Sequence, residues 1–186
     1  MKILRPPELP DLVVIEPEVH RDERGFLLES WRLNRYQDAG IPGPFLQDVH
    51  SYSKEGVLRG LHYQHPDDQG KLVRVTRGRV YDVAVDVRIG SPTFGRWWGV
   101  ELSEDNRRQL WIPPGFAHGF EALSAVDVQY RCTAYYAPAH ARSVAWNDPT
   151  LGIDWPIASP LLSESDAAAP ALAQLQRDGL LPEFMG

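Results

Sequence analysis

Short apolar runs, interrupted by glycine and proline, dominate the middle of the chain. Turn signals separate them at Arg77-Gly78-Arg79, Ile89-Gly-Ser-Pro92 and Ile112-Pro-Pro-Gly115. Many short strands joined by such turns are typical of a β-sandwich or a β-barrel. The pattern predicts strands over Leu72–Thr76, Val80–Val87, Trp97–Leu102, Gln109–Ile112, Gly119–Leu123 and Val128–Ala134.

Helical patterns are weaker and lie towards the ends of the chain. Leu33–Ala39 is expected to form one short helix, because Gly40 and Pro42 follow it and would end it. Pro170–Arg177 is expected to form a second. The chain of 186 residues shows no internal repeat and no linker. We therefore expect one domain over residues 1–186, mainly β with a few short peripheral helices.

Charge and composition exclude several classes of protein. The net charge of -6 argues against a nucleic-acid binder, because phosphate backbones need a positive surface. No stretch approaches the ~20 apolar residues of a membrane helix, and the N-terminus lacks the apolar core of a signal peptide. The expected location is the cytoplasm. Cys132, the single cysteine, cannot form an intramolecular disulfide and is expected to be a buried structural thiol.

Three basic side chains, Arg59, His62 and Lys71, lie at the ends of two apolar segments. On a strand, Lys71 would share a face with Val73 and Val75, which we expect to point inward. A lysine there is costly unless it meets an anion or a cavity; otherwise it extends from the strand end to water. A histidine between two cations suits a general base, although a lone histidine on a strand is more often structural.

Two later segments place polar groups among apolar side chains. His118 would share one strand face with Phe116 and Phe120, either lining an apolar pocket or serving as a hydrogen-bonded core histidine. Tyr130 is expected to point inward with Val128, where its hydroxyl needs a partner. This tyrosine could donate a proton if nearby cations lower its pKa.

Histidine spacing bears on metal binding. Pro114-Gly-Phe-Ala-His118 resembles half of a cupin metal motif, but metal cupins place two histidines one residue apart on the first motif. Here His62 and His65 are three apart, so a regular strand would point them to opposite sides. Lys71 also stands where an acidic ligand would be wanted. We expect a metal-free pocket, and the alternative is a metal-dependent cupin that uses His62, His65 and His118.

From about Asp22 to Leu181 the chain resembles the dTDP-4-dehydrorhamnose 3,5-epimerase family. The resemblance rests on the order of its motifs, each of which is weak alone. These are Asp22-Glu-Arg-Gly-Phe-Leu-Leu-Glu29, Gly56-Val-Leu-Arg-Gly-Leu-His-Tyr-Gln64, Gly70-Lys-Leu-Val-Arg74, Tyr81-Asp-Val-Ala-Val-Asp-Val-Arg88, Ser91-Pro-Thr-Phe-Gly95, Ile112-Pro-Pro-Gly-Phe-Ala-His-Gly-Phe120 and Leu162-Ser-Glu-Ser-Asp166.

The resemblance implies a cupin-type jelly roll that needs no metal and no cofactor, built as a homodimer with strands shared across the interface. It implies a dTDP-4-keto-6-deoxysugar substrate, inverted at C3, at C5 or at both, in the biosynthesis of dTDP-rhamnose or a related deoxysugar. By motif position, His62 matches the general base and Asp166 the carboxylate that orients it. Tyr130 matches the acid on the opposite face of the sugar, and Lys71 the cation next to the ketone oxygen.

The remaining motif positions match groups that hold the substrate. They are Arg59 and His118 near the diphosphate, and Arg24, Phe26, Glu29, Gln47 and Tyr136 at the nucleoside or sugar. Arg59 and His62 are three residues apart, so a regular strand would point them to opposite faces. Either Gly60 permits a bulge, or Arg59 reaches in from the rim.

Three positions depart from the usual family pattern. Val49 stands where asparagine is usual, Ala141 where many members have glutamate, and Ser165 where lysine is frequent. The changes bear on the choice of nucleotide or sugar rather than on the reaction type. The alternatives are therefore an epimerase that acts at C3 alone, a metal-dependent cupin enzyme, and a sugar-nucleotide binding protein without catalysis.

Overall fold

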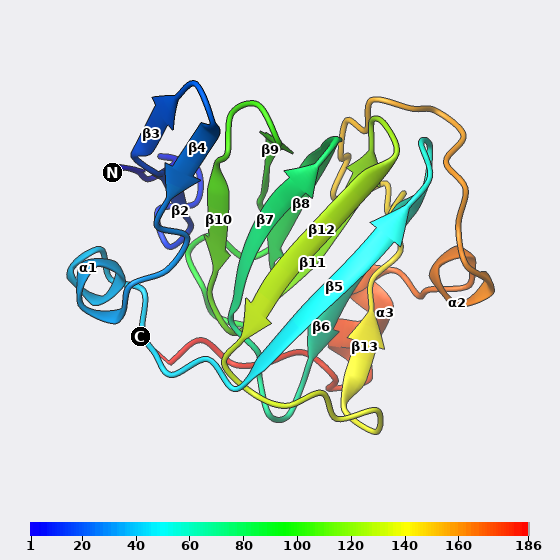
Figure 1. Cartoon of the computed structure of the whole chain (residues 1–186). Coiled ribbons are helices and arrows are strands. Elements are labelled where there is room, and N and C mark those ends of the chain that lie inside the picture. The colour runs from blue at the N-terminus through cyan, green and yellow to red at the C-terminus, as the bar shows by residue number, and fades with distance from the viewer. Residues whose placement is uncertain (186) are drawn as a thin grey trace.

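The computed structural model describes residues 1–185, and most of its regular structure is β. Two sheets face each other, and short helices lie at the periphery (Figure 1). The helices are α1 (Leu33–Asp38), α2 (Glu164–Ala167) and α3 (Leu172–Arg177). The strands are β1 (Lys2–Leu4), β2 (Val13–Glu16), β3 (Val19–Asp22), β4 (Gly25–Leu28), β5 (Gln47–Ser53), β6 (Leu58–Gln64), β7 (Lys71–Arg77), β8 (Arg79–Asp86), β9 (Trp97–Ser103), β10 (Gln109–Ile112), β11 (Phe116–Ala122), β12 (Val126–Cys132) and β13 (Ala141–Ser143).

Strands that are distant in the sequence pair within both antiparallel sheets. One sheet has the order β1-β2-β10-β7-β12-β5, and the other has the order β13-β6-β11-β8-β9. From β5 to β8, and again from β9 to β13, successive strands alternate between the two layers, as in a jelly roll. The predicted fold class, a mainly β sandwich of the cupin type with short helices, is confirmed.

The core lies between the two sheets. Val73 and Val128 from the six-stranded sheet pack against Phe120 from the five-stranded sheet, and none of the three is appreciably exposed. The outer face of the five-stranded sheet is covered by the C-terminal part of the chain, which packs Leu172 and Leu175 of α3 against it. Both faces of that sheet are therefore buried, and its strands are apolar on both sides.

The six predicted strands are confirmed as β7 to β12, with end shifts of at most three residues. The largest shift is in β11, which begins at Phe116 rather than at Gly119. The predicted helices are confirmed as α1 and α3. Strands β1 to β6 and β13 were not among the predicted strands, and all of them except β6 are either short or largely exposed. Among residues 1–185, no helix is long and apolar enough to cross a membrane.

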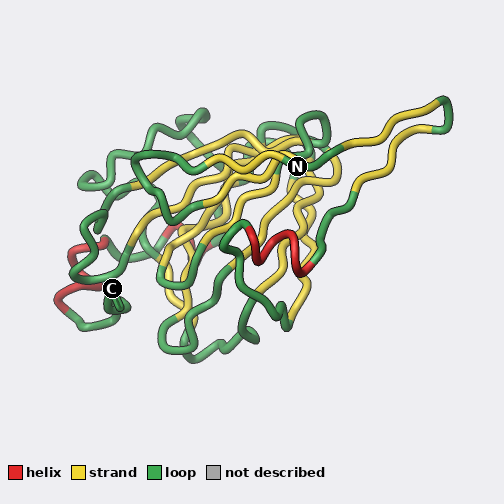
Figure 2. Tube along the Cα trace, turned by 90° about the vertical axis from the view of Figure 1, so that its left-hand side faces the viewer, coloured by secondary structure: helices red, strands yellow, loops and turns green. Residues whose placement is uncertain are grey.

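A two-stranded hairpin, β3 and β4, belongs to neither large sheet. Its ladder runs from Val19 opposite Leu28 to Asp22 opposite Gly25. The hairpin projects far from the sandwich (Figure 2). Phe26 on it is 54% exposed, so a large aromatic ring is presented away from the core of its own chain.

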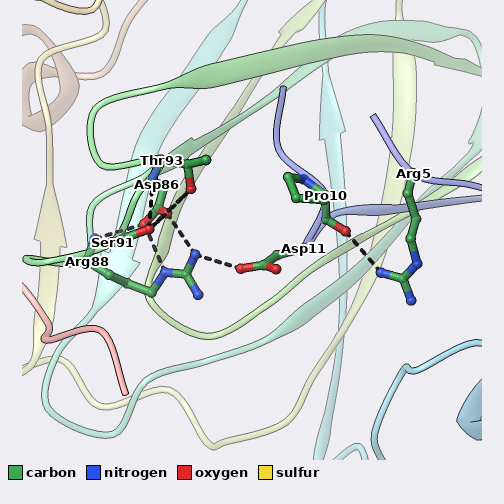
Figure 3. Close-up of polar contacts among 7 residues, drawn as sticks. All are labelled: Arg5, Pro10, Asp11, Asp86, Arg88, Ser91 and Thr93. Atoms are coloured by element: carbon green, nitrogen blue, oxygen red, sulfur yellow. Dashed lines mark hydrogen bonds and ion pairs between the residues drawn. The ribbon is translucent and has the colours of Figure 1, made fainter. Parts of the chain in front are cut away.

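A polar cluster closes one corner of the sandwich (Figure 3). The fully buried Asp86 accepts hydrogen bonds from the guanidinium of Arg88 and from the hydroxyls of Ser91 and Thr93. Burial raises the pKa of Asp86, but these bonds outweigh it and leave the pKa below its usual value. Arg88 also binds Asp11 at 2.8 Å. Two of the sequence motifs therefore build a structural joint between the β8–β9 connection and the N-terminal segment.

Candidate active site

A bulge in β6 sets the direction of its functional side chains. Opposite β11, Arg59 pairs with Phe120 and His62 with His118, so three steps on β6 match two on β11. Arg59 and His62 therefore share the inward face, and of the two explanations left open by the sequence, the register shift supports the bulge at Gly60. Gly60 has a φ of 135°, and a Cβ atom there would lie 2.5 Å from the Cα of Gly119. Only glycine fits this position.

His62 and Asp166 form the central pair of the site. The Nε2 atom of His62 lies 2.6 Å from Oδ1 of Asp166, which projects from α2 and is 5% exposed. Burial raises the pKa of Asp166, but the bond to His62 and the backbone N–H of Gly60 outweigh it, so its pKa is lowered. The hydroxyl of Ser163 accepts the backbone N–H of Asp166 and caps the short helix. The His62 side chain itself remains 46% exposed.

Lys71 and Tyr130 face His62 from the opposite sheet. In the ladder between β7 and β12, Lys71 pairs with Cys132 and Val73 with Tyr130, so all four share the inward face. The predicted inward direction of Lys71 is confirmed. Lys71 is only 8% exposed and donates from Nζ to the backbone oxygen of His62 at 3.3 Å. Burial lowers the pKa of its ammonium group, an effect that Cys132 and Asp82 oppose.

The condition under which the sequence suggested Tyr130 as a proton donor, a pKa lowered by nearby cations, is not met. Burial raises the pKa of this phenol, Cys132 raises it further, and Arg59 opposes the rise without cancelling it. The hydroxyl therefore stays protonated at neutral pH. It can donate a proton but does not exist there as a phenolate.

His62, Lys71 and Tyr130 line one cleft of about 340 Å³. Its walls come from both sheets and from α2, so it opens between the layers of the sandwich. The lining includes Ala141 and Ser165, two of the positions that depart from the family pattern. The full lining is His62, Tyr63, Gln64, Gln69, Lys71, Tyr130, Tyr136, Ala141, Arg142, Ser143 and Ser165.

Asp82 is a buried charged residue that was not among the predicted site residues. It is fully buried on β8, and both of its carboxylate oxygens lie 3.0 Å from Nε2 of His118. His118 is thus a hydrogen-bonded histidine on the inward face, beside its ladder partner His62, and it does not line the cleft. The signal for Asp82 was its alternation with Ala84 on an apolar strand, where a carboxylate needs a buried partner.

The predicted substrate-binding residues fall into two groups. Tyr136 lines the cleft, and the side-chain oxygen of Gln47, which lines a neighbouring hollow, accepts a hydrogen bond from the Tyr136 backbone N–H at 2.8 Å. Arg24 and Phe26 lie on the projecting hairpin and line other hollows. Glu29 follows the hairpin and pairs with Arg35 and Arg32. Within one chain, these three residues do not line the His62 cleft.

The three histidines of the alternative metal site bind three different carboxylates. His62 binds Asp166, His65 binds Asp68, and His118 binds Asp82. In residues 1–185, no three His, Cys, Asp or Glu side chains are grouped as metal ligands. That the pocket works without a metal remains a prediction.

A jelly roll with a histidine–aspartate pair, a lysine and a tyrosine around one inter-sheet cleft has the features of a cupin-type acid–base enzyme. The model of the dTDP-4-dehydrorhamnose 3,5-epimerase family matches residues 6–174. The chain belongs to this family.

Relatives resemble the chain over nearly all of its length. The dTDP-4-dehydrorhamnose 3,5-epimerase of Pseudomonas aeruginosa is 54% identical over 89% of this chain and 93% of its own. The Legionella pneumophila dTDP-6-deoxy-D-glucose-3,5-epimerase, solved in complex with dTDP-4-keto-L-rhamnose, is 50% identical, with a TM-score of 0.95 over 100% of this chain and 99% of that one. A 3'-monoepimerase from Streptomyces bikiniensis, in complex with dTDP-quinovose, is 40% identical, with a TM-score of 0.91 over 97% and 93%.

Proposed function

We propose that the chain is an isomerase that inverts C3 and C5 of a dTDP-4-keto-6-deoxyhexose. The observation that carries the proposal is the grouping of His62, Lys71 and Tyr130 in one cleft, with Asp166 behind the histidine. Family membership supports the same reaction. A C–H bond next to a ketone gives up its proton only when a base and an oxyanion partner act together, and the cleft supplies both kinds of group.

His62 is the base in this proposal. In this proposal Nε2 of His62 keeps its proton and donates a hydrogen bond to Asp166, so the lone pair of the ring lies on Nδ1, which takes the substrate proton. Imidazole has a pKa near ~6.5 and is too weak to deprotonate a sugar carbon unaided. The carboxylate holds the tautomer and stabilises the imidazolium once it forms. The electrons of the broken C–H bond pass to the ketone oxygen, which becomes an enolate.

Lys71 and Tyr130 complete the proposed reaction. An ammonium held rigidly in a buried site stabilises the enolate oxygen as its charge develops. Inversion then requires that carbon receive a proton from the other face of the ring. Tyr130 lies on the sheet opposite His62 and keeps its phenolic proton at neutral pH. It can therefore return the proton that inverts the centre.

The homodimer is part of the same proposal. Arg24 and Phe26 match substrate-binding positions of the family, yet they sit on a hairpin that projects from its own sandwich (Figure 2). Exposed apolar side chains on that hairpin, Phe26 and Leu27 at 54% and 72%, support burial against a second copy. We propose that each hairpin completes the cleft of the partner subunit. A cytoplasmic location also belongs to the proposal, and the single free Cys132 fits a reducing compartment.

NMR of the reaction in deuterated water tests this function. The protein is incubated with dTDP-4-keto-6-deoxyglucose, and deuterium is followed at C3 and C5. We expect deuterium at both carbons and a product with both centres inverted. Exchange at C3 alone would make the chain a monoepimerase. Exchange at neither carbon would contradict the proposed function.

A further inference from the structure

Arg107, in the connection between β9 and β10, stacks on the exposed hairpin. Its guanidinium carbon lies 4.1 Å from the centre of the Phe26 ring. Phe26 and Arg107 line the same hollow beside the six-stranded sheet. The hairpin pairs with no strand of the sandwich. The stacked pair is therefore a contact that fixes where the ring points.

The backbone at Arg107 is held in an unfavourable conformation. Its φ is 53°, a left-handed value that is uncommon for a residue other than glycine, asparagine or aspartate. The neighbouring Asn106 fixes this turn, because its side-chain oxygen accepts the backbone N–H groups of Ser103 and Arg108. The conformation costs free energy, and it aims the arginine at the hairpin.

The guanidinium is positioned more firmly than a surface arginine usually is. One terminal nitrogen donates to the backbone oxygen of Asp105 at 2.8 Å. The Nε atom is buried and has no hydrogen-bond partner among the described residues. Leaving a charged donor unpaired is unfavourable, so the local hydrogen bonds do not explain why the guanidinium lies over the Phe26 ring. The contact with the ring does.

We propose that Arg107 is a positioning residue for nucleotide binding. Its guanidinium covers one face of the Phe26 ring and leaves the other face for the nucleobase. The inference rests on the proposed function, in which Phe26 occupies a substrate-binding position, and it assigns this ring to the nucleobase. A cation over one face of an aromatic ring is attracted to its negative quadrupole. It also restricts the rotation of a ring on an exposed hairpin, so less conformational freedom is lost when a base stacks on that ring.

The substitution Arg107→Gly separates this role from a role in folding. Glycine adopts a φ of 53° without strain, so the variant should unfold at the same temperature as the wild type or above it. The affinity for dTDP should nevertheless fall about threefold to tenfold, by loss of the cation–π contact. We expect kcat to change less than twofold, so the weaker binding should appear as a higher KM. Arg107→Lys retains a cation and should recover part of the affinity.

A double-mutant cycle with Phe26→Ala gives the decisive comparison. If Arg107 acts through the ring, Arg107→Gly should cause no further loss of dTDP affinity in a Phe26→Ala background. Isothermal titration with dTDP measures all four proteins. The matched control is Arg108→Ala, which removes the same charge from the next residue, whose partner is Glu16, and which should bind dTDP as the wild type does.

Three outcomes would overturn the inference. Wild-type affinity in Arg107→Gly would show that the stacking is irrelevant to the nucleotide. An equal loss with and without Phe26 would mean that Arg107 acts by charge alone. An equal loss in Arg108→Ala would point to the same conclusion. A wild-type protein that does not bind dTDP would contradict the proposed function itself, a result distinct from the other three.

Discussion

At the scale of single residues, Lys71 is a buried cation, and we expect its burial to lower the stability of the fold. It is 8% exposed, and its side chain has a backbone oxygen rather than a carboxylate as its hydrogen-bond acceptor. Burial lowers its pKa because the charged form loses hydration. A group that destabilises its own surroundings and faces a cleft is typical of a functional site.

Lys71→Met should therefore make the protein more stable and less active. The apolar side chain removes the cost of burying charge, which we expect to raise the free energy of unfolding at pH 7 by about 1–3 kcal/mol. Without the ammonium at the ketone oxygen, kcat should fall roughly 10²- to 10³-fold. Thermal unfolding and initial rates measure the two effects. Loss of stability together with activity would show that Lys71 is structural.

Asp166→Asn tests the partner of the base. The amide has nearly the same shape, but it carries no charge to stabilise the imidazolium and does not fix the tautomer. We expect kcat to fall about 10²- to 10⁴-fold with little change in KM. Because the pKa of Asp166 is lowered, the stabilisation from its charge is present above the usual carboxyl range and is lost only as the pH falls below it. An unchanged kcat at pH 7 would exclude the role.

At the scale of elements, Glu121 is a buried carboxyl on β11 that links two segments of the chain and does not line the His62 cleft. It is fully buried, and one oxygen accepts the backbone N–H of Ile157, whereas the other has no partner among the described residues. Burial raises its pKa, and the bond from Ile157 opposes the rise. It thus attaches β11 to the segment that leads to α2.

Glu121→Gln should stabilise the protein in a pH-dependent way. A carboxyl with a raised pKa stabilises the folded state when protonated, and that stability is lost as the pH rises through the folded pKa. Glutamine keeps the neutral form and an acceptor for Ile157 at every pH. The unfolding temperature should therefore rise at pH 8 and change little at pH 4. A drop at pH 8 would mean that the carboxylate charge is needed.

The elements that the sequence predicted are those with a regular apolar pattern. Strands β7 to β12 contain short apolar runs that are mostly buried, and glycine or proline marks several of the turns between them in the sequence. The hairpin β3–β4 was not predicted, because its side chains are not buried in its own sandwich. The shared face of Arg59 and His62 depended on whether Gly60 forms a bulge. The close approach of Gly60 to Gly119 is seen only when β6 and β11 are paired. The sequence alone therefore did not decide between a bulge at Gly60 and an Arg59 side chain that reaches in from the rim.

The candidate site was predictable where motifs identify residues and not where the fold brings distant ones together. His62 and Asp166 are 104 positions apart, and only the family resemblance connected them before the geometry placed them at 2.6 Å. Asp82 was missed because its partner, His118, comes from a neighbouring strand 36 positions later. Cation stacking on Phe26 depends on a left-handed residue in a turn, which no sequence pattern indicated.

At the scale of the whole molecule, the hairpin is expected to act in the partner's cleft, and complementation tests this. One inactive variant carries His62→Ala, and the other carries Arg24→Ala with Phe26→Ala. If hairpins are exchanged, a mixed dimer contains one site with both defects and one intact site. Random reassociation of equal amounts should then restore about a quarter of wild-type activity. If verified mixed dimers recover no activity, each hairpin acts in the cleft of its own chain, and the proposed exchange is wrong.

The proton transfer at His62 is the central claim, and deuterium exchange in the His62→Ala variant tests it most directly. Wild type and variant are compared in deuterated water with dTDP-4-keto-6-deoxyglucose, under conditions where both are folded and bind dTDP equally. The account predicts that deuterium incorporation at C3 and C5 falls by at least about 10²-fold in the variant. Exchange at the wild-type rate would contradict the assignment of His62 as the base.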